Sequence, residues 1–337
     1  MKKGVLLVNL GTPDEPSRGA VYKYLKQFLL DPRVIDIPWL QRNLLVRGII
    51  APFRSGESSK IYKKLWTEEG SPIKIYGYTL RNEVQKILGE DYVVELAMRY
   101  QSPSIESAWK KLKAAFVDEV IVFPLFPHYA SASTGSVLEE VMRILSKEQM
   151  IPPLKMINSY FDNKEMIQVF SDNARKHDIN KMDHVLFSFH GVPERHMKKA
   201  DPTQEHCLKK ENCCSTLCNA NKFCYSAQCH QTAHLIAEEL GLPKDKYSIC
   251  YQSRLGKDPW MQPYTTDALK TRREAGDKNL LVFSAAFVAD CLETTIEISD
   301  EYQEEWEEMG GEKLYLVESL NDNPKWVSAV ANMVRNV

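Results

Sequence analysis

Hydrophobic positions along the chain follow two alternating arrangements. Short apolar runs with little polar interruption recur from one end to the other, and longer stretches between them carry apolar residues at helical spacing. Unalternating runs are typical of strands buried on both faces of a parallel sheet. We therefore expect strands at residues 5–10, 92–98, 120–126, 184–189, 247–252, 280–286 and 314–317.

The longer stretches predict helices. Residues 21–29 and 233–240 each place their apolar side chains on one helical face, and further helical patterns follow Pro103, Ser133 and Asn163. The last helix is expected near residues 324–334. Strands that alternate with helices in this way predict an α/β fold with parallel sheets flanked by helices.

The length of the chain suggests two domains. A chain of 337 residues exceeds one ordinary core, because domains typically hold ~100–200 residues. A polar, proline-containing break lies near residues 146–153. We expect a first domain over residues 1–150 and a second over 151–321, with a final helix, about 322–337, that can pack back on the first.

Composition narrows the function classes. The 43 basic and 45 acidic residues give a net charge of -2, so no basic excess indicates a nucleic-acid partner. The apolar start of the chain lacks a small-residue cleavage site and is better explained as a first strand than as a signal peptide. No apolar run approaches the roughly 20 residues that span a bilayer. We expect a cytoplasmic monomer or homodimer with at most peripheral membrane contact. Neither a G-x-G-x-x-G nor a G-x-x-x-x-G-K-[ST] phosphate-binding loop is present.

One predicted strand delivers a histidine to its carboxyl end. The run 184–189 leads directly into His190, and Gly191 and Pro193 then break the strand. Ligands in α/β folds bind beyond the carboxyl ends of parallel strands. A histidine there can accept a proton or bind a metal, because its ordinary pKa is about 6.5. The alternative is a histidine that only caps a turn.

Two carboxylates follow another predicted strand. If a helix begins after Asp290, Glu293 and Glu297 are four residues apart and project from the same face. Such a pair suits a divalent cation or proton transfer. Equally, Asp290 followed by Glu293 is the pattern of an N-cap with its capping-box partner.

The residues together resemble the ferrochelatases, which insert ferrous iron into a porphyrin to make haem. The resemblance covers nearly the whole chain, and the order of its segments makes it specific. These segments are Leu6-Leu-Val-Asn-Leu-Gly-Thr-Pro, Tyr24-Leu-Lys-Gln-Phe-Leu-Leu-Asp-Pro-Arg-Val-Ile-Asp, Gly70-Ser-Pro, Met98-Arg-Tyr-Gln-Ser-Pro-Ser-Ile, Pro124-Leu-Phe-Pro-His-Tyr, Phe189-His-Gly-Val-Pro-Glu-Arg, Asp258-Pro-Trp-Met-Gln-Pro-Tyr-Thr and Asp290-Cys-Leu-Glu-Thr.

The resemblance implies two similar Rossmann-like halves with the porphyrin held in a cleft between them. It also implies that three residues take part in catalysis and in handling the metal. His190 would accept a pyrrole proton, Glu293 would lie on the metal side, and Glu297 would lie behind Glu293. Fe2+ would be a substrate. Many relatives carry a histidine where this chain has Cys291, so iron delivery would depend more on the carboxylates.

Three further residues fall where the family lines its cleft. Trp260 and Tyr100 would grip the faces of the ring, and Arg99 would meet a propionate or form a structural ion pair. We expect protoporphyrin IX as the substrate. Coproporphyrin III, or another tetrapyrrole with cobalt, is the alternative, and a non-catalytic haem or iron–sulfur carrier is disfavoured because His190 and the carboxylates are intact.

Six of the eight cysteines lie between residues 207 and 229. In a cytoplasmic enzyme such clustering favours a metal over disulfides. Cys229 is in phase with the apolar face of a helix, and Cys250 and Cys291 are better explained by packing or position. Some ferrochelatases carry a 2Fe–2S cluster, and only an internal arrangement is possible here because no cysteine follows Cys291. Zinc is the competing occupant. The candidate ligands are Cys207, Cys218 and Cys224, with Cys213 or Cys214 as the fourth.

Overall fold

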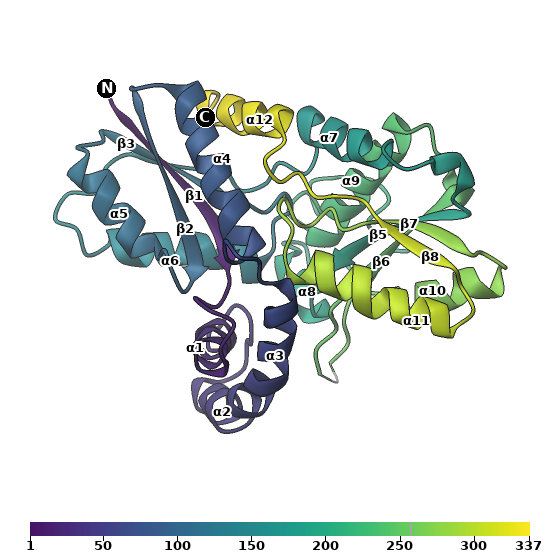
Figure 1. Ribbon diagram of the computed structural model, residues 1–337. Helices are drawn as coiled ribbons and strands as arrows, with labels where there is room; N and C mark the ends of the chain where they lie inside the picture. The colour runs from purple at the N-terminus through teal and green to yellow at the C-terminus, as the bar shows by residue number, and fades with distance from the viewer. Residues whose placement is uncertain (257) are drawn as a thin grey trace. The chain divides into compact units, whose positions relative to one another are not determined.

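The computed structural model describes residues 1–256 and 258–337, which form two compact units. The first unit comprises residues 1–126, 130–158 and 327–337, and the second comprises residues 127–129 and 159–326. Each contains a four-stranded parallel sheet with helices packed around it (Figure 1).

The first sheet has the strand order β2-β1-β3-β4. Its central strand is the apolar run at the start of the chain, in which Val5 to Val8 are at most 2% exposed. This burial on both faces confirms the reading of the unalternating runs as parallel strands. The strands are β1 (Lys3–Gly11), β2 (Tyr92–Tyr100), β3 (Glu119–Pro124) and β4 (Leu154–Met156).

Helices cover both faces of this sheet. Leu6 and Val8 of β1 pack into a core with Trp109 and Val137, whereas Leu96 of β2 lies against Gly77 on the opposite face. The helices of the first unit, including those that do not lie on the sheet, are α1 (Arg18–Leu29), α2 (Trp39–Leu45), η1 (Val46–Ile50), α3 (Ala51–Leu65), α4 (Pro72–Leu88), α5 (Ile105–Ala114), η2 (Ser131–Gly135), α6 (Ser136–Leu145) and α12 (Pro324–Arg335).

The sequence patterns did not predict the helices between residues 39 and 88. In α3 the buried face includes Ser55 and Ser59, which hydrogen-bond to backbone carbonyls of their own helix. A face built from serine carries little hydrophobic periodicity, so this helix depends on tertiary packing. β4 was also missed, because three half-buried residues are too few to form a pattern. β4 pairs with β3, and the first unit therefore continues to Asn158.

The second sheet repeats the topology of the first, with the order β6-β5-β7-β8. In both sheets the first strand along the chain lies between the second and the third. The fold is therefore two similar Rossmann-like halves, as expected. The strands are β5 (His184–His190), β6 (Tyr247–Gln252), β7 (Asn279–Phe283) and β8 (Lys313–Leu316).

The helices of the second unit surround this sheet (Figure 1). They are α7 (Lys164–Ala174), η3 (Ile179–Lys181), α8 (Glu194–Ala200), α9 (Tyr225–Glu239), η4 (Lys244–Lys246), α10 (Thr265–Glu274), η5 (Leu292–Tyr302) and α11 (Gln303–Glu308). Among the described helices, none has the length and apolar character needed to cross a membrane.

Candidate active site

His190 is the last residue of β5 and lies opposite Gln252 of β6. Its Nδ1 is 2.7 Å from the carbonyl oxygen of Gly191. Because a carbonyl can only accept, Nδ1 is the donor in this bond. Nε2 is the ring nitrogen that takes no part in it.

Gly191 allows the chain to turn closely after His190. Its N–H donates to the carbonyl of Gln252 at 2.9 Å. A Cβ at this position would lie 3.0 Å from that same carbonyl oxygen and 3.3 Å from the ring of Trp260. Glycine at this position therefore lets the ring of Trp260 pack against the backbone that follows His190. Trp260 is itself 9% exposed, so most of its ring is occupied by this packing.

The two glutamates lie on η5, a π-helix that follows β7. Cys291 caps the helix, and its capping-box partner is Thr294, whose hydroxyl accepts from the Cys291 N–H at 3.0 Å. Asp290 instead receives the side-chain N–H of Asn321 at 2.7 Å. The alternative capping box of Asp290 and Glu293 is therefore wrong, and Glu293 is not needed to begin the helix. π-helices occur frequently at functional sites.

Glu297 is the most enclosed carboxylate of the site. It accepts hydrogen bonds from Ser253 Oγ at 2.7 Å and Gln252 Nε2 at 3.0 Å. Burial raises the pKa of Glu297, while the Ser253 hydroxyl and the charge of His190 oppose that rise, and the charge of Glu293 adds to it. These mutual effects mean that His190, Glu293 and Glu297 lie near one another, at the carboxyl edge of the second sheet.

Gln252 was not recognised from the sequence, although it ties this site together. Its side chain is almost fully buried, and its Nε2 also donates to the backbone carbonyl of Glu293 at 2.8 Å. Its Oε1 accepts from Ser188 Oγ of β5 at 2.8 Å. The available signal was its place at the end of the predicted strand 247–252, on the same sheet edge as His190.

Cys291 occupies the position at which many members of the family that the chain resembles have a histidine. Burial raises the pKa of the Cys291 thiol well above its ordinary value, and the neighbouring carboxylate of Glu293 raises it further. Cys291 is thus a neutral thiol that hydrogen-bonds Glu293. Within residues 1–256 and 258–337, no group of three or more His, Cys, Asp or Glu side chains is already arranged to hold a metal ion.

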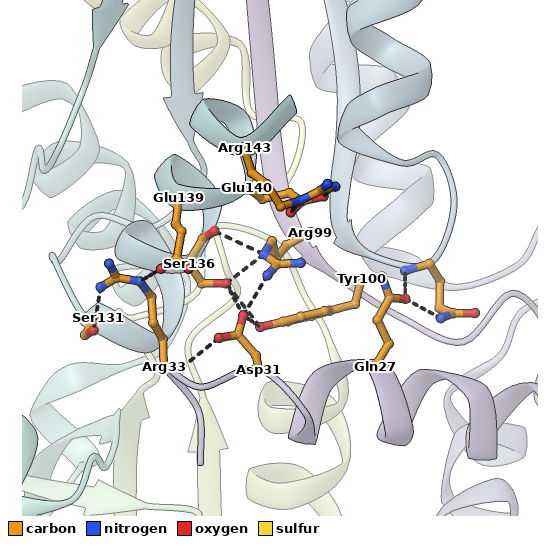
Figure 2. A network of polar contacts seen from close by, with 11 residues as sticks. Gln27, Asp31, Arg33, Arg99, Tyr100, Ser131, Ser136, Glu139, Glu140 and Arg143 are labelled. Carbon is orange, nitrogen blue, oxygen red and sulfur yellow. Dashed lines mark hydrogen bonds and ion pairs between the residues drawn. The ribbon is translucent and has the colours of Figure 1, made fainter. Parts of the chain in front are cut away.

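Arg99 and Tyr100 belong to a network of the first unit, shown in Figure 2. Arg99 Nη2 pairs with Asp31 Oδ2 at 2.7 Å, and the Tyr100 hydroxyl donates to the same oxygen at 2.9 Å. Ser136 Oγ donates to it as well, at 2.6 Å. Tyr100 is 0% exposed, so its ring is not presented to a ligand here. This geometry favours the structural ion pair that was the alternative reading of Arg99.

Asp31→Asn should destabilise the protein by about 3 kcal/mol, because it leaves the partly buried Arg99 without its counter-ion. Chemical unfolding of the two proteins measures this loss. Glu139→Gln is the matched control, since Glu139 pairs with Arg33 in the same network but on the surface. Its effect should stay below about 1 kcal/mol. Equal effects of the two changes would contradict a structural role for the Asp31–Arg99 pair.

The cysteine-rich segment, residues 207–224, gathers four thiols. Cys207 and Cys214 donate to Cys224, and Cys213 Sγ lies 3.8 Å from Cys214 Sγ. The two donated hydrogen bonds and backbone N–H groups at the start of α9 together lower the pKa of Cys224 to about 3, against the effect of burial. Its thiol therefore loses a proton more readily than an ordinary cysteine does.

Cys218, which was also a candidate ligand from the sequence, lies apart from these four cysteines. It is exposed, and we find no contact between its sulfur and the other four among the described residues. Its backbone N–H is bound instead to Asn221 Oδ1 at 2.6 Å, while Asn221 Nδ2 reaches the carbonyl of Cys213 at 2.8 Å. The buried amide of Asn221 thus ties Cys218 to Cys213 through the backbone, while Cys214, with Cys213 beside it, meets Cys224.

The remaining cysteines are packed, in agreement with their interpretation from the sequence. Cys229 is 0% exposed on α9, and Cys250 is buried in β6 with Thr265 Oγ1 at 3.5 Å from its sulfur. All eight cysteines are free thiols.

Comparison with known proteins gives a consistent result. The family model described as Ferrochelatase matches residues 2–337. The chain is 45% identical over 336 residues to a ferrochelatase of Coxiella burnetii (strain Dugway 5J108-111), covering 99% of this chain and 93% of the relative. It is 41% identical over 342 residues to a ferrochelatase of Legionella pneumophila (strain Lens), covering 99% of each.

Solved structures with the same fold include chelatases of low sequence identity. SirB from Bacillus subtilis with Fe3+ matches with a TM-score of 0.53 and 12% identity, covering 100% of this chain and 95% of SirB. CbiX, described as the terminal enzyme for biosynthesis of sirohaem in denitrifying bacteria, matches with a TM-score of 0.51 and 11% identity, covering 99% of each chain. At this identity the likeness concerns the fold alone.

Proposed function

Because this chain belongs to the ferrochelatase family, lyases that make haem by inserting a metal into a porphyrin, we propose that it inserts Fe2+ into protoporphyrin IX to form protohaem. The observation that carries the proposal is the grouping of His190, Glu293 and Glu297 at one sheet edge. Metallation must remove two pyrrole protons and strip water from iron. An imidazole beside two carboxylates offers a proton acceptor and oxygen ligands for these tasks.

His190 is the proposed acceptor of a pyrrole proton. Its Nδ1 is engaged by the carbonyl of Gly191, so the proton would arrive at Nε2. Glu297 lies close enough to His190 for the two side chains to interact electrostatically.

Glu293 and Glu297 are the proposed groups that hold iron and carry protons away. Burial raises the pKa of Glu297, so this carboxyl binds a proton at a higher pH than an exposed glutamate does. Hydrogen bonds from Ser253 and Gln252 fix its orientation. Glu293 is half-buried and is held through its backbone carbonyl by Gln252, which leaves its carboxylate to meet the metal. Trp260 packs next to Gly191 and is largely buried, so only the small exposed part of its ring would contact the porphyrin.

Purified enzyme should convert protoporphyrin IX to haem in the presence of Fe2+ under anaerobic conditions. The experiment compares initial rates with protoporphyrin IX and coproporphyrin III, and with Fe2+ and Co2+, at equal concentrations. A higher kcat/KM for protoporphyrin IX with Fe2+ supports the proposal. A preference for coproporphyrin III would replace the substrate but keep the reaction, whereas no metallation of either porphyrin would contradict the function itself.

We also propose that the cysteine-rich segment holds a 2Fe–2S cluster, with Cys207, Cys213, Cys214 and Cys224 as ligands. Cysteine thiols are the donors that suit such a cluster or, alternatively, zinc, although the four are not already arranged around a metal position among the described residues. The segment has no regular helix or strand between residues 201 and 224, so metal ligation would supply folding energy that a hydrophobic core does not. When bound, the cluster would add thiolate cross-links to this segment.

Anaerobically purified protein should be brown, and Cys224→Ser should abolish the visible absorption because it removes the sulfur to which two other cysteines bind. The spectrum, with iron and zinc content by mass spectrometry, checks this. Cys218→Ser and Cys229→Ser are the matched controls and should keep the colour. Colourless, zinc-loaded protein from iron-replete cells would contradict the cluster and favour zinc, without affecting the chelatase proposal.

We propose a cytoplasmic location, because a segment dense in cysteines favours a metal over disulfides where thiols stay reduced.

A further inference from the structure

One tyrosine connects the cysteine-rich segment to the proposed catalytic histidine. The segment ends at Cys224, the N-cap of α9, and Tyr225 is the first residue of that helix. The hydroxyl of Tyr225 donates to the backbone carbonyl of His190 at 2.9 Å. Two stretches that are 35 residues apart along the chain are thereby joined at the site.

This hydrogen bond lies where the sheet gives His190 little support. The ladder between β5 and β7 ends at Phe187, so on that side the last three residues of β5 have no strand partner. Tyr225 supplies a donor to the carbonyl of the final residue. A strand end that is paired on one side only is freer to move, and an additional buried hydrogen bond restricts that movement.

Tyr225 is itself held in place. Its side chain is buried, and its ring meets the ring of His128 edge-on, with centroids 5.9 Å apart. In its contact with the His190 carbonyl the hydroxyl can only donate, because a carbonyl oxygen accepts. A fixed donor of this kind can position the group that accepts from it.

The cysteine cluster is attached to both neighbours of Tyr225. Cys214 donates to Cys224 on one side, and its sulfur lies 3.2 Å from Ser226 Oγ on the other. Cys207 also donates to Cys224. The first turn of α9, and with it the phenol of Tyr225, therefore takes its position from the cysteine-rich segment.

We infer that Tyr225 is a positioning residue through which the cysteine-rich segment sets the place of His190. The inference rests on the proposed role of His190 and extends it, because it assigns the segment an effect on the chelatase reaction. Rearrangement of the thiols, by loss of a metal or by oxidation, would shift the first turn of α9 and loosen the carbonyl of His190. Tyr225 transmits this change without contacting the porphyrin or the iron.

Tyr225→Phe should lower kcat about 10-fold, while KM for the porphyrin stays within about twofold, because displacement of a catalytic group by a fraction of an ångström impairs the chemical step. Porphyrin affinity, measured by fluorescence quenching, should not change. Tyr251→Phe is the matched control. Tyr251 is equally buried and its hydroxyl lies 3.0 Å from Ser226 Oγ, so this variant also loses a tyrosine hydroxyl at the first turn of α9 but none that reaches His190.

A direct readout of His190 separates positioning from a general loss of stability. Histidine side-chain NMR on protein labelled with nitrogen-15 should show a shifted His190 signal in Tyr225→Phe and an unshifted one in Tyr251→Phe. Because this signal does not depend on turnover, it tests the inference even if His190→Ala proves active and the proposed function fails. An unchanged His190 signal together with wild-type kcat in a folded Tyr225→Phe protein would overturn the inference.

A double-mutant cycle tests the route from the cysteines. If Cys214 acts through Tyr225, the loss of kcat in Cys214→Ser and the loss in Tyr225→Phe should not multiply, and the double variant should resemble the worse single one. Losses that multiply would show that the segment does not act through Tyr225. Cys207→Ser, which removes another contact of Cys224, provides the same cycle if Cys214→Ser does not fold, as judged by circular dichroism.

Discussion

His190→Ala should reduce iron insertion at least about 100-fold, because general acid–base catalysis by a positioned side chain contributes roughly 10²–10⁴-fold. The change removes the Nε2 that would receive the pyrrole proton but leaves the backbone carbonyl that Tyr225 binds. Porphyrin binding should survive, since one imidazole provides little of the contact area of the ring. Anaerobic kinetics with Fe2+ measure the rate, and fluorescence quenching measures the binding.

His234→Ala is the control for the loss of a histidine from the same unit. His234 lies on α9, and its Nδ1 is 2.8 Å from the hydroxyl of Tyr247 at the start of β6. His190 lies at the opposite end of this sheet. This variant should keep its activity within about threefold, because it removes no general acid or base from the reaction. A folded His190→Ala protein with wild-type turnover would remove His190 from the mechanism and return it to the simple turn-capping role.

The second large effect is expected at the carboxylates. Glu293→Gln and Glu297→Gln each keep the volume of the side chain but remove its charge, and each should lower the rate of iron insertion about 100-fold. Glu293 does not form the capping box, since Cys291 and Thr294 do, so a fall in rate cannot arise from a lost helix cap. The rate should be measured over a range of Fe2+ concentrations, which separates weakened iron binding from slower chemistry.

Thermal melting distinguishes these roles from a structural one. Burial raises the pKa of Glu297, which means that the folded protein disfavours its charged form, and Glu297→Gln should not lower the melting temperature. Glu304→Gln, at an exposed position of α11, is the matched control and should leave both rate and melting temperature unchanged. Normal turnover in Glu293→Gln and Glu297→Gln would contradict the assignment of iron handling to η5.

The sequence alone was sufficient for every described strand except β4 and for the position of His190. A parallel strand buried on both faces must be apolar throughout, so β1 and β5 are visible as local runs. The residue that ends such a run lies at the carboxyl edge by necessity, and His190 ends β5. The ordered family segments are also local features, and for that reason they could be read without a structure.

Tertiary structure was required wherever residues distant in sequence meet. Gln252 and Ser253 bind Glu297 across about 45 positions, and no spacing rule encodes such a contact. The spacing of Glu293 and Glu297 placed them on one helical face but could not show that the helix is a π-helix capped by Cys291.

The cysteines show the same limit within a short segment. Density of cysteine in the sequence identified a candidate metal site, but its ligands depend on how an irregular loop turns. The side-chain amide of Asn221 binds the backbone of Cys218 and Cys213, and in this arrangement Cys218 is exposed whereas Cys214 meets Cys224. The contact of Tyr225 with His190 also arises only when α9 packs beside β5. Local patterns determine the elements because burial acts residue by residue, whereas the partners of polar side chains depend on which elements the packed core brings together.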